Sequence, residues 1–191
     1  MEDRMHLIGR ALTGLKRYSQ ALESSILASE IDCNDASAFF SKGKALSGMG
    51  KDTEALECYN KALQLDFRDP SILVNKGLIL LRQRQYTAAV RCFDEVINLD
   101  PQVYRAYEHK GKSLFHLGLY HKSIDCVNRA IQLAPRVARL YADKAMAYFR
   151  LARHQEALDC CGEAIKYDTN NVAFYINAGN LSLSISECES G

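Results

Sequence analysis

The sequence lacks the features that would indicate a membrane protein, a secreted protein or a nucleic-acid binder. An apolar run such as Gly77–Leu81 ends at Arg82 and is far shorter than the roughly 20 residues that cross a bilayer. The N-terminal residues carry acidic side chains and no long apolar stretch, which indicates no secretory signal. A formal net charge of +1 is too balanced to favour nucleic acid as a partner of the whole surface. These absences predict a cytoplasmic protein.

Linkers and catalytic motifs are missing as well. With 3 prolines and no Ser/Gly-rich tract, the chain shows no obvious linker, so we expect one elongated domain over residues 1–191. It contains no phosphate-cradling glycine loop, no paired-cysteine metal spacing and no His-Glu-x-x-His. We therefore expect no catalytic residues, no cofactor and no metal site.

Cysteine is not scarce, but its spacing argues against disulfides and zinc. Four of the 7 cysteines recur every 34 residues, at Cys58, Cys92, Cys126 and Cys160. Equivalent positions in stacked helix pairs lie about 8–10 Å apart, whereas a disulfide needs Cα atoms within about 7 Å. Zinc ligands must likewise converge within about 2.3 Å of one ion. We interpret this ladder as small apolar packing residues on a second helix.

The same 34-residue period organises the whole chain. A small residue opens each unit, at Gly9, Gly43, Gly77, Gly111, Ala145 and Gly179. A second small residue follows twelve positions later, at Ala21, Ala55, Ala89, Ser123 and Ala157. A fixed period of this length is the signature of a stacked repeat protein. Glycine inside a helix costs about 1 kcal/mol relative to alanine, so its recurrence indicates that two helices cross closely there.

Each unit predicts two helices joined by a tight turn. In unit 36–69, apolar residues recur at three- and four-residue steps, Gly48–Gly50 interrupts them, and a second helical stripe follows. Pro101 and Pro135 then close the third and fourth units and stop their second helices.

These residues resemble the tetratricopeptide repeat (TPR). The large apolar residue of its first helix matches Met5, Phe39, Leu73, Tyr107, Tyr141 and Tyr175. Its second-helix aromatic matches Tyr59 and Phe93, whereas Ser25, Val127 and Cys161 depart from the pattern at that position. The resemblance implies an all-α fold, a right-handed α-solenoid of antiparallel helix pairs. The expected repeats are 2–35, 36–69, 70–103, 104–137 and 138–171, followed by a terminal capping helix over about 172–185.

The resemblance also implies a non-catalytic scaffold or adaptor that binds a protein or peptide segment. One face of each first helix would line a concave groove, and seven basic and three acidic residues fall on those positions, a net charge of +4. The rest of the chain is then near −3, which favours an acidic ligand, although charges on a solenoid surface also vary by chance. The candidate groove residues are Arg10, Lys44, Asn75, Arg82, Arg105, His109, Lys112, Phe115, Arg139, Met146, Phe149 and Arg150.

Three alternatives stay open. Some TPR domains clamp a chaperone's C-terminal carboxylate; Asn75 fits that pattern and Arg105 is a plausible replacement, but Phe40 does not fit. The chain is alternatively a self-associating module, a homo-oligomer formed through an uncapped N-terminal end around Met5, Leu12 and Leu15. It is otherwise the targeting arm of a larger enzyme. The sequence does not identify the partner or the oligomeric state, nor whether the ligand is phosphorylated.

Overall fold

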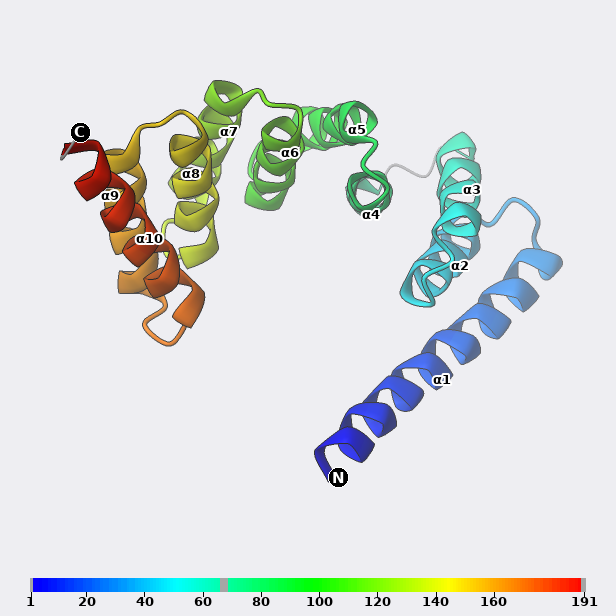
Figure 1. The fold of residues 1–191 in the computed structure, drawn as a ribbon. Coiled ribbons are helices and arrows are strands. Elements are labelled where there is room, and N and C mark those ends of the chain that lie inside the picture. Colours follow the sequence, from blue (N-terminus) through cyan, green and yellow to red (C-terminus); the bar gives the residue numbers. More distant parts are fainter. Residues whose placement is uncertain (1, 66–68, 190–191) are drawn as a thin grey trace. The chain divides into compact units, whose positions relative to one another are not determined.

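In the computed structural model, residues 2–65 and 69–189 are described, with the backbone alone for 2–16, 181 and 183–189. The described parts of the chain form ten helices and contain no strand (Figure 1). Four consecutive pairs are α2 (Ala36–Gly48) with α3 (Asp52–Gln64), α4 (Pro70–Arg82) with α5 (Tyr86–Leu99), α6 (Tyr104–His116) with α7 (Tyr120–Leu133), and α8 (Ala138–Arg150) with α9 (His154–Tyr167). They are flanked by α1 (Glu2–Ile31) and α10 (Val172–Glu189).

The chain divides into two compact units, residues 1–79 and 80–191, with the division inside α4. In the first unit, the core contains Tyr59 of α3 and Ile72 and Ile79 of α4. In the second unit, α5 to α10 pack in sequence order, each helix against the next. The expectation of a single domain over 1–191 stays a prediction.

The first unit differs from the expectation. Residues 2–35 were expected to form a helix pair, but residues 2–31 form the single helix α1, which packs against α2. At the expected turn, Gly14-Leu15-Lys16 stands where the next unit has Gly48-Met49-Gly50, so a helix-favouring lysine replaces the second turn glycine. The helix continues through this point, although Arg84 and Ala152 stand at the equivalent position of two later units and the chain turns there; the residue type at this position therefore does not by itself decide between a turn and a continued helix.

Tight turns separate the helices of the four pairs, and each turn contains one residue with positive φ. These residues are also 34 apart, namely Gly50 (φ 78°), Arg84 (φ 60°), Gly118 (φ 76°) and Ala152 (φ 58°). The left-handed region costs a residue with a Cβ about 1–2 kcal/mol, a cost that glycine avoids.

We expect Ala152→Gly to stabilise the protein by about 0.5–1 kcal/mol, because glycine relieves this strain at the turn between α8 and α9. Urea unfolding of the full chain measures the change. The reciprocal variant Gly118→Ala, at the equivalent turn, should lose a similar amount; a loss in both variants would contradict the explanation.

The small residues lie where the helices of a pair cross, as expected. A Cβ built on Gly43 of α2 would come within 2.5 Å of the Tyr59 ring, and one on Gly111 of α6 within 3.0 Å of Val127. Ser123 replaces the usual alanine, and its hydroxyl donates to the Gly111 carbonyl oxygen at 2.8 Å. This hydrogen bond compensates for burying a polar side chain at the crossing.

The two periodic ladders have structural roles. Cys58 and Cys92 are buried free cysteines, and burial raises the pKa of the Cys58 thiol, which makes it less reactive. Lysine also recurs at the 34-residue period, at Lys42, Lys76, Lys110 and Lys144. Lys76 donates to Asn60 at 2.8 Å and Lys110 pairs with Asp94 at 2.5 Å. Lys76 and Lys110 thus each join a first helix to the second helix before it. Across the described residues, no helix is long and apolar enough to span a bilayer.

Candidate functional site

The first helices of the second unit, α6, α8 and α10, carry two adjoining pockets. A pocket of about 140 Å³ is lined by Lys112, Phe115, His116, Ser123, Asp143 and Met146. One of about 240 Å³ is lined by Ala142, Ala145, Met146, Phe149, Cys161, Asn177 and Asn180. Met146 belongs to both, so the pockets form one surface, which we call the first-helix face. Each pocket is smaller than the roughly 300–1,000 Å³ typical of small-molecule sites and suits single side chains.

The larger pocket originates in a change at one repeat position. Cys161 of α9 stands where α3 has Tyr59 and α5 has Phe93, and those rings are fully buried. Protein interiors are close-packed, so a small side chain in place of a ring leaves space that neighbours fill only in part. The space opens beside Met146 and Phe149, which are large apolar side chains exposed over nearly half their surface.

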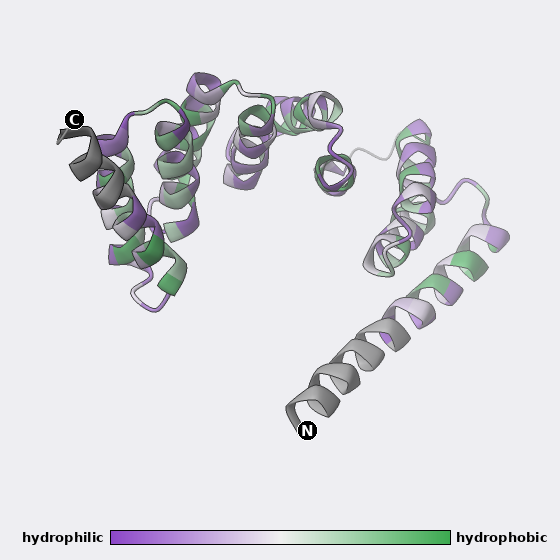
Figure 2. Ribbon diagram, in the orientation of Figure 1, coloured by the Kyte–Doolittle hydropathy of each residue, from purple (hydrophilic) through white to green (hydrophobic). Residues whose placement is uncertain are grey.

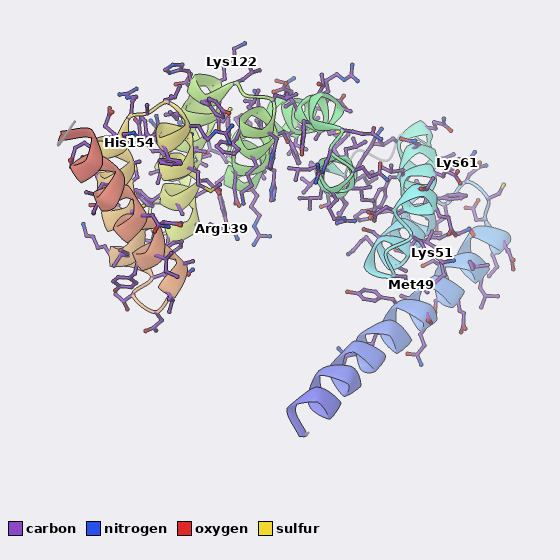
Figure 3. The ribbon with its side chains drawn as sticks, viewed as in Figure 1. Met49, Lys51, Lys61, Lys122, Arg139 and His154 are labelled. Carbon is purple, nitrogen blue, oxygen red and sulfur yellow. The ribbon has the colours of Figure 1, made fainter. Side chains whose placement is uncertain are left out.

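A network of charged side chains joins α6 to α8 beside the smaller pocket. Glu108 is 1% exposed; it accepts hydrogen bonds from Lys112 at 2.9 Å and from Arg139 at 2.7 Å. Lys112 also pairs with Asp143 of α8 at 3.3 Å. Arg139 is seen on α8, and its guanidinium reaches α6 (Figure 3). A buried carboxylate needs such partners, because an unpaired charge in the interior costs several kcal/mol.

The two carboxyl groups of this network are shifted in opposite directions. Burial raises the pKa of Glu108, but the hydrogen bond and charge of Lys112, with the charges of His109 and Arg139, outweigh it and lower the pKa overall. For Asp143, burial and the nearby Glu108 charge prevail over Lys112 and Arg139 and raise the pKa to about 6. Asp143 therefore exchanges its proton near neutral pH, whereas Glu108 stays ionised.

Several candidate groove residues lie together on α6 and α8. Arg105 is exposed on α6, where its Nε lies 3.4 Å from the Tyr104 hydroxyl. Arg150 is exposed on α8 and places its guanidinium 5.9 Å from the Phe115 ring centre and 5.3 Å from that of Tyr120. Lys112 and Arg139, expected to face a ligand, instead have Glu108 as a partner. With both carboxylates ionised, Arg105 and the network together carry +1.

The remaining candidate residues are more scattered. His109 lies against the Phe93 ring, 5.6 Å between ring centres, and burial lowers its pKa. Lys44 and Asn75 belong to the first unit, where Lys44 lies over Phe40 and the Asn75 amide donates to its own helix. Arg82 lies exposed in the last turn of α4. The side chain of Arg10 lies outside the described residues.

The sequence placed Glu108 and Asp143 on the groove positions but did not reveal that they form ion pairs with Lys112 and Arg139. The available signal was two acidic residues among four basic ones, Arg105, Lys112, Arg139 and Arg150, on the groove positions of two adjacent first helices. Asn177 and Asn180 were also groove positions but were not selected, and both line the larger pocket. Among the described side chains, no group of three His, Cys, Asp or Glu residues could hold a metal ion.

Antiparallel helix pairs at a 34-residue period, with a first-helix face carrying side-chain-sized pockets, define a helical-repeat interaction protein. Family models described as "Tetratricopeptide repeat" match residues 74–138 and 138–171, and one described as "TPR repeat" matches 48–84. The chain belongs to the tetratricopeptide repeat family and has its all-α, right-handed solenoid fold. Family membership makes protein–protein interaction its functional class.

Solved structures show the same fold at low sequence identity. MamA 41-end from Desulfovibrio magneticus RS-1 superposes with a TM-score of 0.78 at 21% identity, over 85% of this chain and 93% of that one. YrrB, described as "a TPR protein with an unusual peptide-binding site", gives 0.75 at 18% identity, over 92% and 87%. A search of curated protein sequences found no match.

Proposed function

We propose that the chain is a non-catalytic scaffold that holds an acidic segment of a partner protein, with an apolar anchor, on the first-helix face. The observation that carries this proposal is the exposure of Met146 and Phe149 beside a pocket of about 240 Å³. Large apolar side chains around a concave surface mark interaction sites more often than chance exposure. The peptide-binding site named for YrrB supports a peptide ligand in the same fold.

Charge supports the acidic character of the ligand. Arg105 and Arg150 are exposed on α6 and α8, and a guanidinium stacked on an aromatic ring keeps its edge N–H groups available for a carboxylate. Lys112 and Arg139 add to the positive electrostatic potential of the face rather than contacting the ligand directly, because both already form ion pairs with Glu108. The packed helices pre-organise this surface, so most of the conformational entropy lost on binding is lost by the partner segment.

A second candidate function is self-association. The side chains of Met5, Leu12 and Leu15, first considered for this contact, lie outside the described residues. Within the described part of α1, however, Leu27 and Ile31 are largely exposed, which favours a contact on this helix.

The groove proposal predicts a specific sequence pattern in the ligand. It also predicts that two variants of the chain bind this ligand more weakly. Selection from a random peptide display library on the full chain should enrich an aliphatic or aromatic residue flanked by Asp or Glu. Met146→Asp removes the anchor contact and Arg105→Glu reverses a ligand-facing charge. Each should weaken a selected fluorescent peptide at least about tenfold by anisotropy titration.

Arg129→Glu is the matched control, because Arg129 is an exposed arginine on α7 whose guanidinium binds Gln132. It should leave the affinity unchanged. The proposal fails if no such pattern is enriched, or if the selected peptide binds both groove variants as tightly as the original chain.

A further inference from the structure

The larger pocket of the first-helix face lies where earlier helix pairs hold an aromatic ring. In the pair α2 and α3, the fully buried Tyr59 ring lies beside Gly43 and 6.0 Å from the Phe40 ring, between ring centres. In the next pair, the fully buried Phe93 ring lies 5.6 Å from the ring of His109 on α6. These contacts identify the first-helix positions that surround a second-helix ring.

The same repeat positions line the pocket beside α8 and α9. Counted in steps of 34 residues, three lining residues are equivalent to the ring neighbours, namely Ala142 to Phe40, Ala145 to Gly43 and Asn177 to His109. The ring itself is replaced by Cys161, which is buried and also lines the pocket. The volume of about 240 Å³ is therefore the place of the missing ring, between α8, α9 and α10.

Ala145 explains why the chain does not fill this place itself. A Cβ at the equivalent Gly43 would lie 2.5 Å from the Tyr59 ring, so a ring attached to α9 would collide with the Ala145 side chain. A ring that a partner brings is not attached to α9, and it can lie farther out, against the half-exposed Met146 and Phe149. The pocket therefore accepts a ring from outside more readily than one from its own second helix.

The size and the lining of the pocket suit an uncharged ring. A dry apolar cavity of about 150 Å³ is large enough to bind benzene, and this pocket is larger. None of the described side chains that line it carries a charge, and burial raises the pKa of the Cys161 thiol, which stays protonated at neutral pH. The α10 turns that lead to Asn177 are mostly hydrophobic (Figure 2). A charged side chain would lose its hydration here without gaining an opposite charge.

Three lining side chains favour an aromatic ring over an aliphatic side chain. Met146 and Cys161 bring sulfur atoms to the pocket, and the sulfur of methionine makes favourable contacts with the edges of aromatic rings. The unbranched Met146 side chain also adapts its shape to an occupant. Phe149 is 47% exposed beside them, and its ring can form an edge-to-face pair with a second ring.

We propose that this pocket binds a phenylalanine or tyrosine ring of the partner segment, in the place that Tyr59 and Phe93 fill in earlier pairs. The inference rests on the proposed function, because it names the anchor of the segment held on the first-helix face. Cys161 then determines specificity, since a ring at this position of α9 occupies the site itself.

Filling the pocket from within the chain tests the proposal. The double variant Ala145→Gly with Cys161→Phe restores the arrangement of Gly43 with Tyr59, so its own ring should occupy the site. Gly162→Phe is the matched control, because it adds the same ring to α9 at an exposed position with no atom within 4 Å of its Cβ. Circular dichroism should show unchanged helicity in both variants.

The first ligand is p-cresol, the side chain of tyrosine as a free molecule. Titrated into a full chain with ¹³C-methyl methionine, it should shift the Met146 methyl signal to saturation, and the signal is assigned by its absence from Met146→Leu. The control should respond like the original chain, whereas the double variant should bind p-cresol at least about tenfold more weakly. Saturable binding that is absent from the original chain, or equal in the double variant, overturns the inference.

The second ligand is the peptide selected by display on the full chain. Its anchor should be Phe or Tyr, and replacing that anchor by leucine should weaken binding about threefold or more by anisotropy titration. An equally tight leucine peptide overturns the inference and leaves the groove function standing. If no peptide is selected while p-cresol still binds at Met146, the groove function fails and the ring site is supported.

Discussion

Replacing Gly43 by valine is expected to destabilise the first unit by about 2–3 kcal/mol. The added Cβ alone would lie 2.5 Å and 2.7 Å from two ring carbons of Tyr59. That ring is fully buried in the core with Ile72 and Ile79, so it cannot move without displacing its neighbours. Overpacking of this kind typically costs about 1–3 kcal/mol, and the γ-methyl groups add to the clash.

The measurement is urea unfolding of the full chain, with the free energy of unfolding extrapolated to water. Gly162→Val on α9 is the matched control, because a Cβ there meets nothing within 4 Å. It should change stability by less than about 0.5 kcal/mol. Equal effects of the two substitutions would show that helix propensity, rather than the close crossing of α2 and α3, determines the result.

Replacing Lys112 by methionine is expected to destabilise the second unit by about 2 kcal/mol at pH 7. The substitution removes one of two cations that bind the buried Glu108 and the cation that pairs with Asp143. Stripping a partner from a buried charge usually costs about 3–5 kcal/mol. The expected loss is smaller here because Arg139 remains 2.7 Å from Glu108.

The loss should depend on pH in a definite direction. The pKa of Glu108 is lowered in the folded state, so its ion pairs stabilise the fold above the unfolded pKa and are lost as the pH falls through the folded pKa. The pKa of Asp143 is raised to about 6; its ionisation therefore lowers stability as the pH rises from about 4 to 6. The difference between Lys112→Met and the original chain should thus be largest at pH 7 and shrink toward pH 4.

Thermal or urea unfolding at several pH values between 4 and 8 measures this difference. Lys122→Met provides the control, because Lys122 is an exposed lysine on α7 (Figure 3). Its effect should be small at every pH. A loss for Lys112→Met that is independent of pH would mean that the methylene stem, rather than the charge, stabilises the pair α6 and α8.

Much of the fold was predictable because it depends on local and periodic features. Helices begin at residues 36, 70, 104, 138 and 172, and this spacing follows from the 34-residue recurrence of small and apolar residues. The close crossings at Gly43 and Gly111 were predictable for the same reason, since only a packing requirement explains a repeated glycine inside a helix. The course of α1 was not predicted, because Lys16 permits either a turn or a continued helix.

The candidate site was predictable only as a set of positions. The sequence placed Lys112, Met146 and Phe149 on the first-helix face, and the two pockets include all three. It did not show that Arg139 binds Glu108 across 31 residues, because several cations on that face could have satisfied the same carboxylate.

The sequence alone determined the TPR class, the helix pairs from residue 36 onward and the positions where helices cross, because these depend on period and residue size. Tertiary structure decided the charge available to a ligand. The packing of α8 on α6 brings Arg139 to a carboxylate that is buried only in the folded chain. It also decided the exposure of Ala21, which matches the buried Ala55 and Ala157 in residue type but lies exposed on the continuous helix α1.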